Sequence, residues 1–321
     1  IDLYDDVKSN DWQDLTFGRL GSSFNHNLSI MGGGDSFKYN ISYAMVTDKA
    51  IMEMSGFKRD NFSAKFNSKP HKKIGLDFSM RYSKTKVFGA STSTNEDKGS
   101  TRESRVKYAV IFIPFPVKGL ISDEGETDPD FNLYNPIESI SDNDRLTYKK
   151  QFNAQFAFSW EILDGLKLKS EVGFNDNKSD ESRFFGLTTY YVKNNTSIKE
   201  QPAVSFVQKD KEGLRSTNTL NLDINKLFVD SEDHTVNVLL GHEYFVTHSK
   251  SQSSITDGLP VFFTSENAFN MPALGSAMSI ERTNSPDDVL VSWFARANYD
   301  YQSKYLLSAT FRADGSSKFG E

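Results

Sequence analysis

The stretch Phe152-Asn153-Ala154-Gln155-Phe156-Ala157-Phe158-Ser159-Trp160 decides the fold of this chain. Its even positions carry only apolar residues, and its odd positions carry polar or small ones. Successive side chains of a β-strand point to opposite faces, so a period of two predicts a strand with one apolar and one polar face. The same alternation runs through residues 74–83, 166–174, 291–301 and 305–312.

Weaker alternation predicts further strands at 25–31, 37–46, 57–67, 214–228 and 234–248. This gives about ten strands, most near the 9–11 residues with which a tilted strand crosses a bilayer, whereas soluble strands average about 5–6 residues. We therefore expect residues 1–321 to form part of one all-β domain, an antiparallel up-and-down transmembrane β-barrel. Residues 1–20 do not alternate, and residues 1–12 are expected to form a short helix or turn.

The connections between these strands alternate in length. Short links are expected at 32–37, 68–72, 161–165, 230–233 and 302–303, and longer ones at 47–56, 87–148, 177–213 and 249–288. In a meander every second connection emerges at the same end, so the short turns lie on one side and the long loops on the other. That asymmetry is typical of outer-membrane barrels, with short periplasmic turns and long extracellular loops.

Four aromatic residues lie beside the short turns, and they are predicted to form a girdle at the inner membrane interface: Trp160, Phe228, Tyr301 and Tyr305. The alternative is that they are ordinary core residues at strand ends. The polar faces must contact water. In a barrel this water fills the lumen or lies against a plug, whereas in a soluble sandwich it is bulk solvent. The charged members of these faces are Asp77, Arg81, Lys167, Lys169, Glu171, Arg296 and Arg312.

Composition excludes several classes of protein. The chain contains no cysteine, which excludes disulfides and thiolate metal sites, and its net charge of −6 argues against a nucleic-acid partner. The chain contains no run of about 18 apolar residues, so the sequence predicts no membrane-spanning helix. The chain opens without a signal peptide in what reads as mid-domain sequence, so a partial chain is expected.

Several stretches resemble the SusC/RagA-type TonB-dependent transporters. They are the segment Asn10-Asp11-Trp12-Gln13-Asp14, then residues 25–30 with the Gly32-Gly33-Gly34-Asp35 turn, then residues 57–62. The most specific similarity covers residues 296–301 and 304–320, which include the signature residues Arg312, Asp314, Gly315, Ser316 and Ser317.

This resemblance implies a 22-stranded barrel with an N-terminal plug, of which this chain would supply the early to middle strands. It also implies a SusD-like lipoprotein that closes over the barrel, and TonB acting through an N-terminal region that this sequence lacks. Such proteins import glycans or oligopeptides as nutrients across the outer membrane of Bacteroidetes-type bacteria. The expected surroundings are outer-membrane lipid, with no nucleic acid.

No constellation of residues predicts an enzyme. His242 and Glu243 are adjacent in a strand and point to opposite faces, so they cannot share a metal. Gly32-Gly33-Gly34 lacks the Lys-Ser/Thr tail of a phosphate loop and predicts a tight turn. No cofactor is expected, although the acidic segment 123–130 offers oxygen ligands for calcium without EF-hand spacing.

Aromatic residues in the long loops are the candidates for contact with a ligand or with the lid, because exposed aromatics either pack or bind. They are Tyr108, Phe112, Phe115, Phe184, Phe185, Tyr190, Tyr191, Phe262 and Phe263. Packing of the loops against one another explains them equally well. Arg312 and Asp314 are expected to form an inward-facing ion pair that fixes the turn after them, with ligand contact as the alternative.

The leading hypothesis is therefore TonB-dependent import of a glycan or oligopeptide together with a SusD-like lid. A passive porin or adhesin barrel is the first alternative, and a soluble carbohydrate-binding β domain is the second. The sequence does not distinguish a glycan from a peptide substrate.

Overall fold

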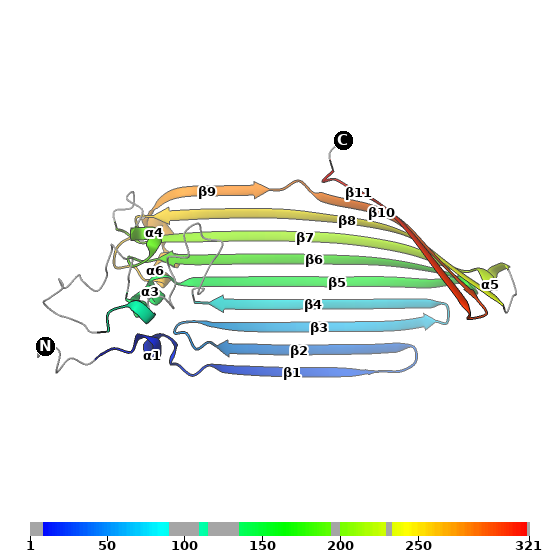
Figure 1. Ribbon diagram of the computed structural model, residues 1–321, viewed down its shortest axis with the longest axis horizontal. Helices are drawn as coiled ribbons and strands as arrows, with labels where there is room; N and C mark the ends of the chain where they lie inside the picture. The colour runs from blue at the N-terminus through cyan, green and yellow to red at the C-terminus, as the bar shows by residue number, and fades with distance from the viewer. Residues whose placement is uncertain (1–8, 90–108, 115–134, 194–199, 229–232, 320–321) are drawn as a thin grey trace, which may run out of the picture.

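The described part of the chain forms one antiparallel β-sheet. The computed structural model describes residues 9–89, 109–114, 135–193, 200–228 and 233–319. Within these ranges eleven strands pair in the order β1-β2-β3-β4-β5-β6-β7-β8-β10-β11, and β9 pairs with β8 beside β10 (Figure 1). Apart from this shared use of β8, each strand pairs with its neighbour in sequence, as an up-and-down meander requires, and the predicted all-β barrel-type fold is confirmed.

The strands have the following bounds: β1 (Ser22–Gly33), β2 (Phe37–Lys49), β3 (Gly56–His71), β4 (Ile74–Phe88), β5 (Arg145–Leu163), β6 (Leu166–Phe185), β7 (Ala203–Asp223), β8 (His234–Asp257), β9 (Ser276–Asn284), β10 (Asp288–Tyr301) and β11 (Tyr305–Ser316). The short helices are α1 (Trp12–Phe17), α3 (Pro136–Asp142), α4 (Tyr190–Lys193), α5 (Ile224–Phe228), α6 (Ser265–Asn270) and the 3-10 helix η4 (Pro272–Leu274).

The strands are longer than alternation predicted. β6, β7 and β8 contain 20, 21 and 24 residues, so the long loops expected at 177–213 and 249–288 are wrong over much of their length. β9 was missed altogether, which is why about ten strands were expected. The polar strand β9 pairs with residues 250–257 of β8, and β10 pairs with residues 234–247. Together β9 and β10 act as one interrupted strand beside β8. Backbone pairing continues where the apolar pattern stops.

The short hairpins, which join β1 to β2 and β5 to β6 among others, have the turn residues that the sequence predicted. Leu163 pairs with Leu166 across Asp164-Gly165, and Gly165 adopts φ +90°, which glycine tolerates without steric cost. Gly33 closes the first hairpin with φ +138°, which confirms the tight turn expected at the glycine run. The predicted link at 230–233 is wider, because the predicted strand 214–228 ends at Asp223 and α5 follows it.

One face of the sheet is apolar over the width of a membrane. In β4 the residues Ile74, Leu76, Phe78, Met80 and Tyr82 lie on this outward face, opposite Trp160, Phe158, Phe156, Ala154 and Phe152 of β5. The rise of the strand from the first of these residues to the last is about 27 Å. Large apolar side chains remain exposed on this face, with Phe156 at 46% and Trp293 at 63%. An apolar face of this height matches the lipid-facing band of an outer-membrane barrel.

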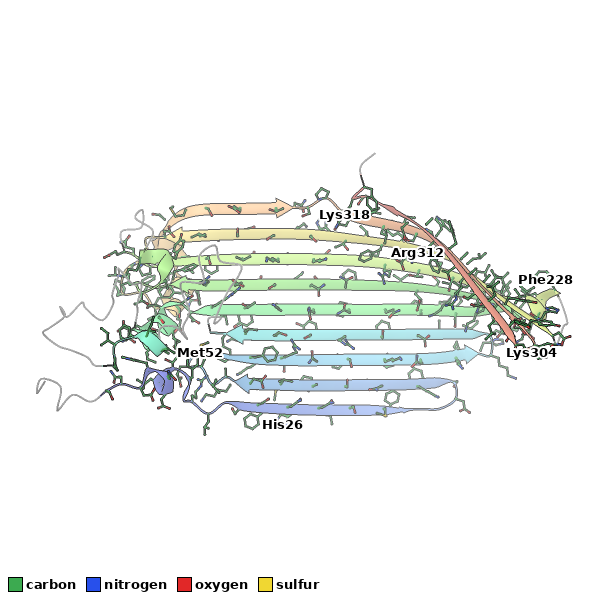
Figure 2. The ribbon with its side chains drawn as sticks, viewed as in Figure 1. His26, Met52, Phe228, Lys304, Arg312 and Lys318 are labelled. Atoms are coloured by element: carbon green, nitrogen blue, oxygen red, sulfur yellow. The ribbon has the colours of Figure 1, made fainter. Side chains whose placement is uncertain are left out.

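The aromatic residues beside the short turns lie at the hairpin end of the sheet. Trp160, Phe228 and Tyr305 are exposed by 42%, 76% and 70%, and Figure 2 places Phe228 at that end. The rings of Tyr301 and Tyr305 lie 6.3 Å apart across the last hairpin. Their exposure suits the predicted girdle better than packing in a core.

Helices α1, α3, α4 and α6 gather at the opposite end, which we call the rim (Figure 1). Helix α1 covers Trp12–Phe17. Most of the helix or turn expected over residues 1–12 lies outside the described ranges. Asp11 caps α1 by accepting a hydrogen bond from the backbone N–H of Asp14 at 2.9 Å. Trp12 packs edge-on against Phe112 and donates its indole N–H to the carbonyl of Ile113. Trp12 thus holds α1 against residues 112–113 at the rim.

The two faces can be tested with neighbouring residues of β5. Phe156→Arg places a cation on the outward face and should destabilise the protein in a bilayer by about 2–4 kcal/mol. Gln155→Arg, on the opposite face, should change stability by less than about 1 kcal/mol. Denaturant unfolding of the full transporter from lipid vesicles measures both changes. Equal losses for the two variants would contradict the assignment of the faces.

Candidate functional site

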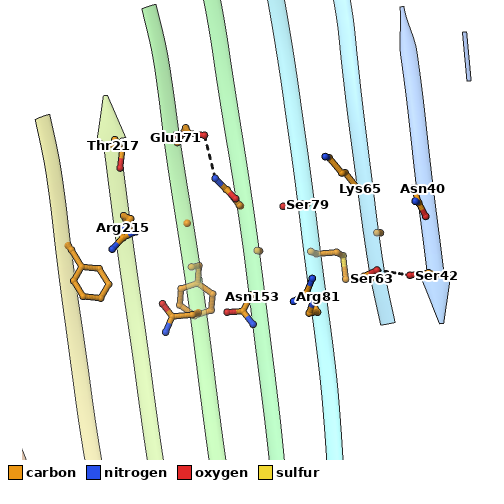
Figure 3. A pocket seen from close by; sticks show the side chains of 18 of the residues that line it. Asn40, Ser42, Ser63, Lys65, Ser79, Arg81, Asn153, Glu171, Arg215 and Thr217 are labelled. Atoms are coloured by element: carbon orange, nitrogen blue, oxygen red, sulfur yellow. Dashed lines mark hydrogen bonds between the residues drawn. The ribbon is translucent and has the colours of Figure 1, made fainter. Parts of the chain in front are cut away.

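The polar face of the sheet lines a hollow of about 960 Å³, shown in Figure 3. Alternate residues of strands β2 to β8 project into it, because every second residue of a strand shares a face. The polar lining consists of Asn40, Ser42, Ser63, Lys65, Ser79, Arg81, Asn153, Gln155, Glu171, Asn175, Arg215, Thr217 and Glu243. A surface of amides, hydroxyls and charges facing one space suits a water-filled lumen, so we call it the lumenal wall.

Hydrogen bonds between strands stiffen part of the lumenal wall. The hydroxyls of Ser42 and Ser63 lie 2.7 Å apart, and Gln155 donates to Glu171 at 3.4 Å (Figure 3). Lys169 Nζ lies 2.7 Å from the Glu171 carboxylate. The predicted polar face is confirmed for these residues. The sequence placed Ser79, Arg81, Asn153, Gln155 and Glu171 on polar faces. It missed the other lining residues, although the same alternation would have found them in β2, β3 and β7.

A second hollow of about 960 Å³ lies on the same face near the rim. Its apolar floor includes Met52 and Phe57, and its sides carry Lys149, Lys209 and Lys211. The turn 50–55 beside it is held by Arg19, whose guanidinium donates to the carbonyls of Ala50, Met52 and Ser55 at 2.6–2.9 Å. The lumenal wall therefore becomes more basic toward the rim.

The Arg312–Asp314 pair is present on the lumenal face. Arg312 Nε donates to Asp314 Oδ1 at 2.8 Å, and its Nη2 donates to Ser292 Oγ at 3.0 Å. Glu243 lies 3.5 Å from the same guanidinium. Just beyond the pair, Ser317 Oγ accepts a hydrogen bond from the backbone N–H of Val289 at 2.9 Å. These contacts tie β11 to β10 and β8.

Most of the described aromatic candidates are packed into the rim. Phe184 and Phe263 are 2% and 8% exposed and share a cluster with Val204, Leu259 and Ala268. That cluster lies between α6 and the outward side of β6 and β7.

A second cluster lies on the opposite side of the same strands. Phe185 packs there against Tyr191, with ring centroids 4.7 Å apart, and against Val192 and Ala203. Phe112 is buried against Trp12. The structure therefore assigns these side chains to packing within the rim.

Phe262 differs from the others, because 77% of its surface is exposed. Tyr108, Phe115 and the acidic segment 123–130 lie outside the described residues, and Tyr190 lies in α4, where its side chain is not described. Contact with a ligand or lid stays a prediction for all of them, and Phe262 is the described candidate with a free surface.

Buried polar groups connect the rim segments. Arg183 is 7% exposed, donates to Asn143 at 3.1 Å and lies 4.5 Å over the ring of Phe185; burial lowers its pKa to about 10. Tyr191 donates its hydroxyl to Asp257 at 3.1 Å. Burial raises the pKa of Asp257, and the Tyr191 hydrogen bond opposes that rise. These are structural contacts, since each links one rim segment to another.

The histidines do not assemble into a reactive centre. His242 packs on Trp293 on the outward face at 4.5 Å between centroids, and His248 lies 2.6 Å from Asp287. Within the described ranges no group of three or more His, Asp or Glu side chains could hold a metal ion. None of the described helices is both long and apolar enough to cross a membrane.

Sequence relatives are found along nearly the whole chain. TonB-dependent receptor P3 of Formosa agariphila is 27% identical over 318 residues, which cover 97% of this chain and 30% of the receptor. TonB-dependent receptor SusC of Bacteroides thetaiotaomicron is 20% identical over 331 residues, again 97% of this chain and 30% of the relative. The chain thus spans less than a third of these relatives. No protein-family model matches it.

Solved structures share the fold. The RagAB peptide transporter aligns with 100% of this chain and 35% of its own, with a TM-score of 0.74 and 16% identity. The ferric preacinetobactin receptor BauA of Acinetobacter baumannii aligns more distantly, with a TM-score of 0.52 and 10% identity over 93% of this chain and 41% of its own. The chain is thus similar along nearly its whole length to TonB-dependent receptors that include SusC, and its sheet has the fold of the outer-membrane barrels of such transporters.

Proposed function

We propose that the protein to which this chain belongs imports a glycan or an oligopeptide across the outer membrane, driven through TonB and assisted by a SusD-like lipoprotein lid. The observation that carries this proposal is the pairing of a lipid-facing apolar band with a lumenal wall of amides, hydroxyls and charges on the same strands. Such a wall offers hydrogen bonds to a hydrated cargo of many polar groups, such as an oligosaccharide or a peptide.

The names of the relatives support the direction and the energy source of transport. Both curated proteins described above are named TonB-dependent receptors, and the RagAB complex of known structure is named a peptide importer. These names support a non-enzymatic role. No observation on the described residues favours the passive porin or adhesin alternative.

The arginines of the lumenal wall are suitable cargo contacts, because Arg81 and Arg215 are exposed and face the hollow in Figure 3. A hydrogen bond between a charged side chain and the cargo contributes about 1.5–3 kcal/mol to binding. The variant Arg81→Ala/Arg215→Ala should therefore lower uptake at subsaturating cargo by about tenfold or more.

The test uses a strain that lacks the parent gene and is complemented with the full-length protein. Growth on defined oligosaccharides or on defined peptides as sole nutrient identifies the cargo. The matched control is Tyr82→Ala/Ser216→Ala, which changes the next residues of the same strands on the outward face. Growth that does not depend on the gene, or on TonB, with either nutrient would refute import.

The rim aromatics give a second prediction. Phe184→Ala should destabilise the rim by about 3–5 kcal/mol, because it leaves a cavity in a buried cluster. Phe262→Ala should leave stability within about 0.5 kcal/mol and weaken capture of the lid or cargo. Hydrogen exchange of the β6–β8 ends measures the first effect, and affinity for the purified lipoprotein or cargo measures the second. Unchanged affinity in Phe262→Ala would remove Phe262 as a contact.

A further inference from the structure

The outward face carries a cluster of lysines immediately beyond the apolar band, and no property of the import pathway accounts for it. The cluster consists of Lys58 on β3, Lys84 and Lys86 on β4, and Lys150 on β5. The even positions of β4 and β5 form the lipid-facing band up to Tyr82 and Phe152, and Lys84 and Lys150 are the next outward residues. The lysines therefore lie where the hydrocarbon ends on the rim side of the membrane.

The pairing of the strands brings these cations together. Lys84 is directly opposite Lys150, and Lys58 is directly opposite Lys86. Side chains in such positions have Cβ atoms about 4.5–5.5 Å apart, and like charges placed there repel each other. Lys58, Lys84 and Lys150 are also exposed. An anion bound between these lysines would relieve their repulsion.

Carboxylates on the described strands meet this need only in part. Asp60 lies opposite Lys84, but it already accepts a hydrogen bond from the Tyr43 hydroxyl at 2.6 Å. On the next strand Asp180 lies opposite Tyr148, and Asp176 is 3.5 Å from Lys178. Farther along, β7 contributes Asp210 and Glu212 at the same height. The outward surface is thus basic over β3–β5. On β6 and β7 it is mixed, because Lys178 lies opposite Lys150 among the carboxylates of Asp176, Asp180, Asp210 and Glu212.

Aromatic rings complete the surface. Lys86 Nζ lies 5.4 Å from the ring centre of Tyr148 and 6.0 Å from that of Phe88. Below the lysines, Tyr82 and Phe62 lie opposite each other and are each 37% exposed, continuous with the lipid-facing band. A molecule that suits this surface has an anionic head at the lysines and apolar chains against the rings below.

We propose that Lys58, Lys84, Lys86 and Lys150 bind the phosphate groups of an anionic glycolipid of the outer leaflet, with its acyl chains on the apolar band beneath. The site is independent of the import route, because it lies on the other face of the sheet. The carboxylates of Asp210 and Glu212 on β7 disfavour a phosphate group farther along the sheet.

The test uses the full-length transporter in a mild detergent, with diphosphorylated lipid A as the probe and native mass spectrometry as the readout. The variant Lys58→Gln/Lys84→Gln/Lys150→Gln should lower lipid A affinity about 10- to 100-fold at low salt, because each lysine at an anionic membrane surface contributes about 1 kcal/mol. Wild-type affinity should fall as salt is raised.

Matched controls separate this site from general charge effects. Lys149→Gln/Lys209→Gln/Lys211→Gln removes the same charge on the lumenal side at similar height and should bind lipid A as wild type does. Dephosphorylated lipid A should bind wild type and both variants alike and weakly. Retained lipid A affinity in the outward variant, or an equal loss in the lumenal control, would overturn the proposal. Full competition by inorganic phosphate alone would also overturn it, since it would show a site for free anions. Cargo uptake by the same variants reports separately on import.

Discussion

The constraint on which the whole structure depends is that backbone groups in hydrocarbon find no water to bind. Each unsatisfied N–H or C=O there costs several kcal/mol, so a chain that crosses with strands must pair every one of them. Antiparallel pairing accordingly continues from β1 to β11, with β9 and β10 sharing β8 as a partner. Hairpins with few residues follow from this, because a short turn lets the next strand pair at once.

Continuous pairing also fixes what each side chain meets. Lys149 and Lys150 are neighbours in β5, yet one faces the basic hollow of the lumen and the other the lipid boundary. A shift of one residue in register would exchange the two environments along the whole strand. Function on either face is therefore a property of the register, and the outward and lumenal surfaces can evolve separately within the same strands.

The sequence predicted the part of the fold that lies in the membrane, because there the outward face must be apolar and the alternation is strong. It failed above the membrane. Residues 177–185 and 203–213 were expected to be loops, yet they pair as extensions of β6 and β7. Their outward residues contact water or other segments of the rim, so nothing requires the apolar period that would reveal a strand. Likewise, Phe184 and Phe185 read as loop aromatics, whereas pairing partners distant in sequence bury them.

The extended strands make the rim a layered structure and not a set of free loops. The Phe184–Leu259 cluster covers one side of β6 and β7, and the Phe185–Val192 cluster covers the other. Arg183 and Asp257, both buried, add polar ties between the same segments. A platform packed on both sides resists deformation, because a buried cluster has no spare volume to rearrange into. Within the described part of the rim, a lid or cargo would therefore contact side chains that already project from this platform, as Phe262 does, and would leave the clusters beneath it closed.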